Sequence, residues 1–384
     1  MLGLAAPSVS EQQRLVKAVV DERFGLGVLT DYLADENVEN IDVNGCDQIW
    51  ITYADGSKVA GPPIANSDEE LIEKIRLWAI HGGMTAREFS ASSPLLNSTL
   101  GDNIRVSAVM SVSTRPHLSL RRHGLKDVTL TQLRHLGSID HRLQSFLAAA
   151  VRARKNIVVT GGVNAGKTTM LRALAAEIPP DERIATLESE YELYFHQLPD
   201  RHRDVVPLES RAANSEGHGA ITLMDLIPQS LRMNIMRVVV GEVRSTEIIP
   251  MLEAMNMGQE GSLTTIHANS PQEIFNRILI LALRGGLSMP PETVHLLTGM
   301  ALDFVVHMRR DRRTNQRYVS EVMEVMEPAD TILPAHNLIY RPGPDGRAVP
   351  ATTPQCLGEL IAAGFDASAL EMWPPVYQLP AGRS

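Results

Sequence analysis

The segment 157–176 constrains the fold of this chain more than any other stretch. A short apolar, β-branched run leads into a glycine-rich loop, and a helical pattern follows the loop. Main-chain N–H groups in such a loop, together with the positive end of the helix, attract phosphate oxygens. Four residues match the pattern G-x-x-x-x-G-K-[ST] in the strand–loop–helix context that it requires, which argues against a chance glycine-rich turn: Gly161, Gly166, Lys167 and Thr168.

The side chains of this loop can share the binding of a nucleoside triphosphate. Lys167 can reach the outer phosphates, and the hydroxyl of Thr168 can ligate Mg²⁺. The sequence therefore predicts a site for a nucleoside triphosphate with Mg²⁺. The candidate binding residues of the loop are Gly161, Gly162, Val163, Asn164, Ala165, Gly166, Lys167, Thr168 and Thr169.

Composition indicates a soluble chain with more than one domain. With 384 residues, the chain is longer than one hydrophobic core usually supports. Its net charge of -9 argues against a bulk nucleic-acid binder. The two cysteines lie far apart, which argues against a disulfide framework or a zinc site and fits a reducing cytoplasm. The longest aliphatic run, 278–283, is too short to cross a bilayer, so membrane association is expected only through partners or a surface.

Local patterns divide the chain into a smaller α+β domain and a larger α/β domain. The stretch 36–122 contains a hairpin pattern, a helical pattern and further strands. After a polar linker at 123–133, strands and helices alternate over 134–327, as in nucleotide-binding domains. The predicted fold class is α/β, with a P-loop NTPase domain that follows a smaller α+β domain. A helical segment is predicted at 1–35, and a Pro-rich tail with a short helical patch at 328–384.

Two acidic residues end predicted strands of the larger domain. Glu242 follows the buried-strand pattern at 237–241, and a site that hydrolyses a nucleoside triphosphate needs a carboxylate there to hold Mg²⁺ or to orient water. We favour this role over an ordinary acidic residue that leaves a strand. Glu188 follows the strand pattern at 183–187 and can polarise the attacking water. A solvated acidic turn explains its segment equally well, because three glutamates occur within five residues.

A histidine and three arginines complete the candidate site residues. His267 ends the strand pattern at 262–267 and can sense the γ-phosphate by hydrogen bonding, although a single histidine more often satisfies local structure. Arg105, Arg121 and Arg122 lie on predicted strands of the smaller domain. A guanidinium group suits bidentate phosphate contact, including contact between subunits. Spacing alone nevertheless favours a role for these arginines in keeping the surface hydrated.

Taken together, these segments resemble the secretion ATPase superfamily, which powers type II and type IV secretion and the assembly of type IV and tight-adherence pili. The resemblance runs from about residue 39 to about residue 325 and looks closest to the tight-adherence pilus or type IV secretion branch. Residues 231–233 and 238–244 resemble the Walker B segment of that branch, and 261–270 resemble its histidine box. Residues 43–45 and 102–106 resemble its N-terminal domain.

The resemblance implies a RecA-like ATPase domain and a homohexameric ring, with ATP held between the two domains of each subunit. It makes Glu188 a candidate for the acidic-box carboxylate and His267 a candidate for a phosphate sensor. It also makes Arg105, Arg121 and Arg122 candidates for contacting the nucleotide from the N-terminal domain.

The predicted function is therefore that of a cytoplasmic motor that hydrolyses ATP. Lys167 would position the phosphates, Thr168 and Glu242 would hold Mg²⁺, and Glu242 with Glu188 would prepare the water, with His267 as the sensor. An inner-membrane platform protein of a pilus or secretion system is the expected partner, so the chain would sit peripherally at the cytoplasmic membrane.

Four positions depart from the pattern of the superfamily. Asn164 stands where a third glycine is usual, Ser189 replaces the acidic-box Asp and leaves Glu188 and Glu192 to carry its charge, Gln259 replaces the first His of the histidine box, and Arg237 lies near the usual Pro-Asp pair. Asn tolerates a left-handed backbone, so nucleotide binding should survive, but slow turnover is expected.

Two rival functions stay open. One is a DNA-transfer or nucleic-acid motor on a similar core, against which the acidic net charge argues, so no nucleic-acid partner is expected. The other is a regulatory subunit that binds ATP with little hydrolysis, which the departures from the pattern support.

Overall fold

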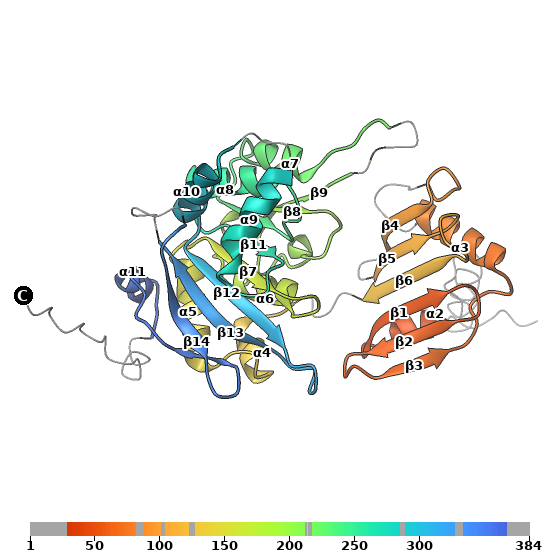
Figure 1. The fold of residues 1–384 in the computed structure, drawn as a ribbon, viewed down its shortest axis with the longest axis horizontal. Helices are drawn as coiled ribbons and strands as arrows, with labels where there is room; N and C mark the ends of the chain where they lie inside the picture. Colours follow the sequence, from red (N-terminus) through yellow and green to blue (C-terminus); the bar gives the residue numbers. More distant parts are fainter. Residues whose placement is uncertain are drawn as a thin grey trace, which may run out of the picture. The chain divides into compact units, whose positions relative to one another are not determined.

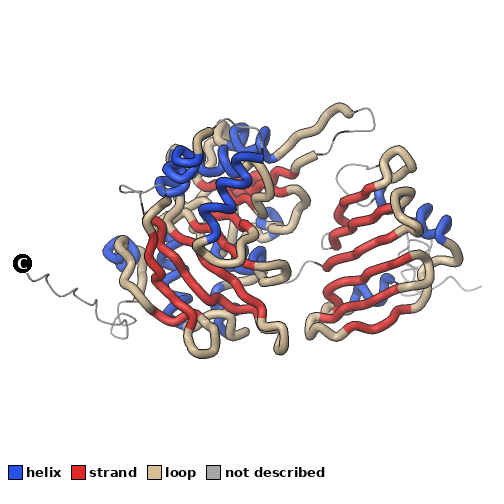
Figure 2. The backbone as a smooth tube through the Cα atoms, viewed as in Figure 1, coloured by secondary structure: helices blue, strands red, loops and turns tan. Residues whose placement is uncertain are grey.

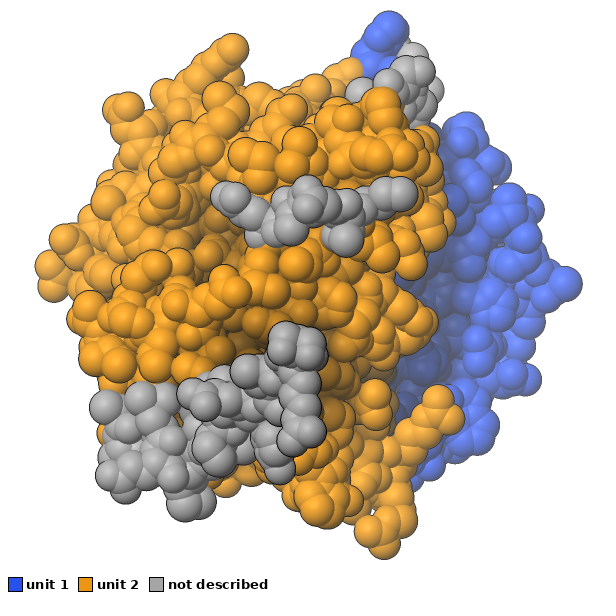
Figure 3. Space-filling model, turned by 60° about the vertical axis from the view of Figure 1, so that its left-hand side comes forward, with its two compact units in different colours: residues 1–124, 213–218 blue, residues 125–212, 219–384 orange. Residues whose placement is uncertain are grey.

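The structure is a computed structural model that describes residues 29–81, 88–100, 104–122, 127–211, 213, 217–284, 289–326 and 333–366. The chain divides into two compact units, which Figure 3 colours separately: residues 1–124 with 213–218, and residues 125–212 with 219–384. Most of the predicted helical segment at 1–35 and the end of the predicted tail lie outside the described residues. Apart from that tail, the division into five segments made from the sequence stays a prediction.

Unit 1 is an antiparallel sheet with helices packed on one face. Its elements are α2 (Leu29–Ala34), β1 (Val38–Asn44), β2 (Ile49–Tyr53), β3 (Lys58–Gly61), α3 (Asp68–His81), β4 (Leu95–Leu100), β5 (Ile104–Val109) and β6 (His117–Arg122). The described strands form one six-stranded sheet in the order β3-β2-β1-β6-β5-β4. Alternate residues of the strands, such as Ile41 and Leu120, pack with Leu71 and Ile75 of α3 in one hydrophobic cluster. The period of two along each strand therefore sets which face is buried.

The hairpin predicted in the smaller domain is confirmed as β1 and β2, which pair antiparallel. Gly45 follows β1 with a φ of 73°, a left-handed conformation that suits glycine at the turn. Strands β3 and β4 have no counterpart in the sequence predictions. Both lie at an edge of the sheet, and β3 is largely exposed, so neither carries the alternating apolar pattern that marks a half-buried strand.

Unit 2 is a sheet with helices on both faces (Figure 1). Its strands are β7 (Ile157–Gly161), β8 (Arg183–Glu188), β9 (Asp204–Glu209), β10 (Arg237–Val240), β11 (Leu263–Ile266), β12 (Phe304–Arg310), β13 (Arg317–Val325), β14 (His336–Pro342) and β15 (Ala348–Pro350). Its helices are α4 (Leu130–His135), α5 (His141–Arg152), α6 (Lys167–Ala175), the 3₁₀ helix η1 (Phe195–Gln197), α7 (Leu223–Ser230), α8 (Ile248–Asn256), α9 (Glu273–Arg284), α10 (Pro291–Ala301) and α11 (Leu357–Ala362).

The order of the described strands in unit 2 is β15-β14-β13-β12-β7-β11-β10-β8-β9, and Figure 2 shows them in red. The six strands from β12 to β9 in this order are parallel, and β13, β14 and β15 extend the sheet in antiparallel fashion. Strand β7 lies between β11 and β12, which come more than 100 residues later in the chain. Because parallel strands end at the same edge, the residues that follow β7, β8, β10 and β11 are brought together there.

Two hydrophobic clusters cover the two faces of this sheet. Ile157 and Val159 of β7 pack with residues of α4, α5 and α6 in one cluster. Val158, between them, packs with residues of α7, α8, α9 and α10 in the other. Burial on both faces explains why the central strands are continuous apolar runs in the sequence. The four strands predicted for the larger domain, at 156–160, 183–187, 237–241 and 262–267, are confirmed as β7, β8, β10 and β11.

Part of the stretch predicted as a Pro-rich tail belongs to the core of unit 2. Strand β14 pairs with β13, and β15 pairs with β14. Pro342 and Pro350 each stand at the last position of a strand, where a missing N–H costs least, so the prolines are compatible with the sheet. The helical patch predicted near residue 360 is confirmed as α11, whose Leu360 is fully buried. The predicted tail is therefore corrected over its described part, 333–366.

Candidate active site

The phosphate loop connects β7 to α6 and has the backbone of an anion-binding nest. Gly161 has a φ of 149°, and a Cβ atom there would lie 2.5 Å from the main-chain oxygen of Met308. Asn164 and Gly166 have φ angles of 58° and 91°, in the left-handed region. Left-handed residues between right-handed ones turn successive N–H groups towards one point, where an anion is attracted. Asn164 thus adopts the conformation for which glycine is usual, and the carbonyl oxygen of Asn164 accepts a hydrogen bond of 3.0 Å from Nε of Arg317 on β13.

The side chain of Lys167 lies over this loop and is largely buried. Its Nζ donates to the carbonyl oxygen of Gly162 at 2.9 Å. The same atom lies 3.2 Å from Nδ1 of His267, which follows β11. The structure therefore brings together two residues predicted to act at the site, although 100 positions separate them in the chain.

Glu242 follows β10 and is held by two basic side chains. Its Oε1 lies 2.9 Å from Nε2 of His267, and its Oε2 accepts hydrogen bonds from Nε and Nη2 of Arg244 at 2.8 and 2.6 Å. Burial by itself would raise the pKa of Glu242, but the hydrogen bonds from His267 and Arg244 outweigh it and lower the pKa to about 2. When the ring proton of His267 is on Nε2, this nitrogen donates to Glu242. Nδ1 of His267 can then accept a hydrogen bond from Nζ of Lys167. One continuous series of polar contacts then joins Lys167, His267, Glu242 and Arg244.

Glu188, at the end of β8, lies in a different environment. Its side chain is buried, and its Oε1 accepts hydrogen bonds of 2.9 Å from the main-chain N–H groups of Glu192 and Leu193. Burial raises the pKa of Glu188 to about 8, more than these hydrogen bonds lower it. A carboxyl group that is mostly neutral at pH 7 is poorly suited to activating water. The catalytic role predicted for Glu188 stays untested, but its contacts indicate that it shapes the 188–193 segment.

Glu192, in the same segment, lies close to the start of the helix that follows the phosphate loop. Its Oε2 lies 3.5 Å from Oγ1 of Thr168, the predicted Mg²⁺ ligand. From the sequence, Glu192 was assigned only a share of the acidic-box charge. The run of three glutamates in five residues was the available signal, but it does not show which carboxylate is buried and which faces Thr168.

The three arginines predicted to contact nucleotide lie in unit 1, whereas the phosphate loop lies in unit 2. Arg105 on β5 is paired with Arg121 on β6, so both stand on the same face of their sheet. Arg122 is paired with Ile104 and therefore belongs to the opposite face. Their contact with nucleotide stays a prediction.

Arg237, one of the departures from the pattern, forms a buried ion pair. It begins β10, at the end of the strand opposite Glu242, and its side chain is fully buried. Its Nε and Nη2 donate to the two carboxylate oxygens of Glu182 at 2.7 and 2.8 Å. Its Nη1 donates to the carbonyl oxygen of Val151 at 2.8 Å. This buried, bidentate pair ties β10 to the segment before β8 and lies away from the predicted chemistry.

The donor set at the loop suits Mg²⁺ that arrives with phosphate. Among the described residues, no group of three or more His, Cys, Asp and Glu side chains could hold a metal ion. Mg²⁺ commonly keeps several waters and binds through one or two carboxylates and the phosphates of a substrate. Thr168, Glu192 and Glu242 supply oxygen donors of this kind. The nest, Lys167 and these oxygen donors therefore fit a Mg²⁺–nucleotide complex.

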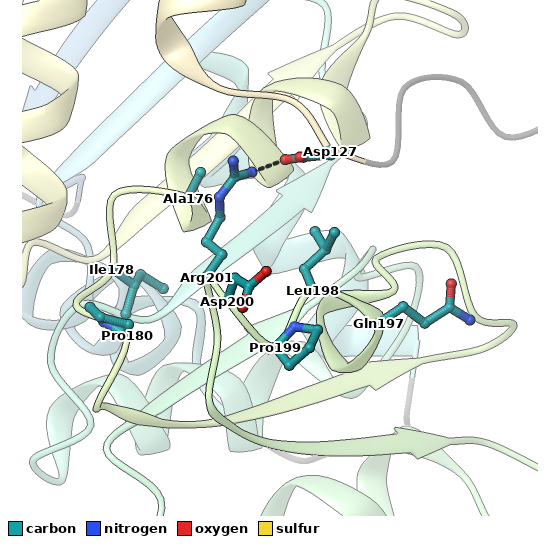
Figure 4. Close-up of a pocket in the computed structure, with 9 residues that line it drawn as sticks. All are labelled: Asp127, Ala176, Ile178, Pro180, Gln197, Leu198, Pro199, Asp200 and Arg201. Carbon is teal, nitrogen blue, oxygen red and sulfur yellow. Dashed lines mark hydrogen bonds and ion pairs between the residues drawn. The ribbon is translucent and has the colours of Figure 1, made fainter.

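A separate pocket of about 430 Å³ lies elsewhere in unit 2, and Figure 4 shows its lining. An ion pair between Arg201 and Asp127 stands at its wall. None of the residues predicted to act on nucleotide lines this pocket, whose lining residues are Asp127, Ala176, Ile178, Pro180, Gln197, Leu198, Pro199, Asp200 and Arg201.

Comparison with known proteins identifies the family of the chain. Residues 68–311 match the family described as Type II/IV secretion system protein. The chain belongs to the type II/IV secretion ATPase superfamily. It is 32% identical over 311 residues to a putative conjugal transfer protein of Mycobacterium tuberculosis, a match that covers 79% of this chain and 85% of the relative. It is 27% identical over 351 residues to the type IV secretion system protein VirB11 of Brucella suis, covering 84% of this chain and 95% of that one.

Solved structures of secretion ATPases share the fold. The Legionella pneumophila ATPase DotB superposes with a TM-score of 0.56 at 17% identity, covering 77% of this chain and 79% of that chain. The pilus retraction motor PilT superposes with a TM-score of 0.52 at 15% identity, covering 92% of this chain and 98% of that chain. These likenesses confirm the predicted fold class, and membership of the superfamily identifies the chain as an ATPase. Within the part of the chain that the structure describes, no helix is both long and apolar enough to span a membrane.

Proposed function

We propose that this chain is a motor that couples Mg²⁺-dependent ATP hydrolysis to type IV secretion or pilus assembly. The observation that supports it most is the contact of Lys167, from the phosphate loop, with His267, which in turn contacts Glu242. Three residues that are predicted to have distinct roles in nucleotide hydrolysis thus meet at the edge of the sheet where parallel strands end. Such edges are where α/β proteins bind nucleotides.

Each side chain has a role that its environment supports. Lys167 is directed at the loop and can exchange the carbonyl oxygen of Gly162 for a phosphate oxygen. Thr168 and Glu192, with Glu242, would hold Mg²⁺, which neutralises the charge that develops on the phosphates when it is bound. Glu242 has a low pKa and stays ionised, so it can accept a hydrogen bond from the attacking water. His267 contacts both Lys167 and Glu242, so its hydrogen bonds to them can change when the γ-phosphate binds.

The assembly proposed for this chain is a homohexameric ring in the cytoplasm. Arg105, Arg121 and Arg122 of unit 1 would contact the nucleotide, within one subunit or from its neighbour. The ring would act at the cytoplasmic membrane through an inner-membrane platform protein. Support comes from membership of the superfamily and from the VirB11 relative, which is named as a type IV secretion protein. Assignment to the tight-adherence branch belongs to the same proposal.

Phosphate release by the purified full chain tests the proposed function. We expect release that requires Mg²⁺ and that falls by about 10²–10³-fold in Lys167→Ala, because a preorganised donor to the transferred phosphate is lost. Lys74→Ala is the matched control, since Lys74 forms a surface ion pair with Glu70 in unit 1. Unchanged release in Lys167→Ala would contradict the proposal. Tight ATP binding without turnover would instead select a regulatory subunit.

A second candidate function is a DNA-transfer motor, which the name of the M. tuberculosis relative favours. The net charge of -9 argues against a large phosphate-binding surface on one subunit. Single-stranded DNA should therefore leave the turnover of wild-type protein unchanged. Stimulation of turnover, together with an affinity for DNA that falls steeply with salt, would favour the second candidate.

A further inference from the structure

Arg244 is the one partner of Glu242 that the roles above leave unexplained. It stands on the loop after β10, and its guanidinium group donates twice to Oε2 of Glu242. His267 contacts the other oxygen, so basic groups face both sides of the carboxylate. A carboxylate engaged in this way has little capacity left for a further cation.

Acidic residues from more than one segment of the chain interact with Arg244. Besides Glu242, the carboxylates of Glu190 and Glu192, in the segment after β8, attract its guanidinium group. Glu192 also lies beside Thr168. Three carboxylates therefore attract Arg244, and one of them, Glu192, lies beside the hydroxyl group of Thr168 that is expected to ligate Mg²⁺.

The main chain of this loop is fixed, whereas the side chain of Arg244 is half exposed. The N–H groups of Arg244 and Ser245 donate to Oε1 of the buried Glu247 at 2.6 and 2.9 Å. The N–H group of Val243 donates to the carbonyl oxygen of Thr265 at 3.0 Å. The guanidinium group can consequently leave Glu242 by side-chain rotation alone, without movement of the main chain.

We propose that Arg244 is the built-in counter-ion of the Mg²⁺ site and competes with Mg²⁺ for Glu242. The inference rests on the nucleotide site proposed above and adds a residue that regulates it. The guanidinium group neutralises Glu242 while the site holds no nucleotide. Two cations on one carboxylate repel each other, so Mg²⁺ entering with nucleotide displaces the guanidinium group. The carboxylate is then available only when Mg²⁺ and nucleotide are both in place.

Nucleotide binding, rather than turnover, tests this inference. The full-length protein is mixed with ADP that carries a fluorescent label on its ribose, and Mg²⁺ is titrated to find the concentration that gives half-maximal binding. Arg244→Gln should lower this concentration about fivefold, as expected for the loss of a partly exposed ion pair. Arg244→Lys keeps the charge and should need more Mg²⁺ than Arg244→Gln. The control Arg341→Gln removes one charge from an exposed position on β14 and should match the wild type.

A second comparison shows whether the effect passes through Glu242. In a Glu242→Gln background the competition is already absent, so Arg244→Gln should produce no further shift. An unchanged or higher Mg²⁺ requirement in Arg244→Gln, with an unchanged melting temperature, would overturn the inference and indicate that Arg244 only positions Glu242. If wild-type protein binds no labelled ADP at any Mg²⁺ concentration, the nucleotide site itself is refuted.

Discussion

The substitution Glu188→Gln tests whether the carboxyl group of Glu188 has a catalytic or a structural role. With a pKa of about 8, the carboxyl group of Glu188 is mostly protonated at pH 7. An amide has nearly the same shape as a neutral carboxyl group, and its oxygen can accept the same two hydrogen bonds from Glu192 and Leu193. We therefore expect Glu188→Gln to keep the turnover of the wild type at pH 7 and to melt at the same temperature or higher.

The substitution Glu188→Ala provides the contrast. It leaves the N–H groups of Glu192 and Leu193 without their acceptor, at a cost of about 1–3 kcal/mol for each buried donor, or about 2–6 kcal/mol in all. The melting temperature should fall clearly, and nucleotide affinity should weaken because the segment carries Glu192 beside Thr168. Phosphate release at saturating Mg²⁺–ATP and thermal unfolding measure the two effects.

The dependence of stability on pH gives an independent check. The pKa of Glu188 is raised from 4.5 to about 8 in the folded chain, so the folded state binds more protons than the unfolded state between these values. This contribution is fully present below about pH 4.5 and is lost as the pH rises through 8. Glu188→Gln lacks this titration, so its stability relative to the wild type should rise from pH 5 to pH 9. A loss of turnover of about 10²-fold in Glu188→Gln, with unchanged melting, would refute the reasoning and make Glu188 catalytic.

Three further predictions follow from single contacts. Gly161→Ala should weaken the binding of labelled ADP by about tenfold or more, because the added Cβ would lie 2.5 Å from a main-chain oxygen of β12; binding equal to the wild type would contradict the tight approach of the loop to β12. Glu242→Gln should lower phosphate release by about 10²–10⁴-fold yet keep nucleotide binding, and loss of both would argue against a role in the chemical step. Glu182→Ala should cost about 3–5 kcal/mol in the free energy of unfolding, because it leaves Arg237 as a buried, unpaired charge. Asp204→Ala, which breaks a more exposed pair, should cost less than about 1 kcal/mol, and equal costs would contradict the burial argument.

The sequence predicted four neighbouring strands of unit 2 but missed β12 and β13, which extend the sheet beside β7, and the strands at the sheet edges. Strands β7, β8, β10 and β11 are buried on both faces, so each is a continuous run of apolar residues that can be recognised locally. Strands β3 and β4, at the two edges of the sheet of unit 1, carry more polar and exposed residues. In unit 2, strands β14 and β15 lie among prolines that suggested a tail. Pairing with a neighbouring strand stabilises them, and this neighbour is not visible in a local pattern.

The same division holds within the site. The phosphate loop could be recognised because its glycines, Lys167 and Thr168 are close in the chain and their roles follow from a local turn. The roles of the glutamates could not be ranked in this way. Glu188 and Glu192 are four positions apart, yet one is buried against main-chain N–H groups and the other faces Thr168.

The sequence by itself determined that a nucleotide-binding loop follows a buried strand, because backbone conformation, helix start and phosphate-binding groups all lie within one short segment. Only the tertiary structure decided which carboxylate stays ionised. That property depends on desolvation and on partners that are distant in the chain: Glu242 gains His267 and Arg244 and has a low pKa, whereas Glu188 is buried and has a high one. Electrostatic environment is set by packing in space, and no local pattern encodes it.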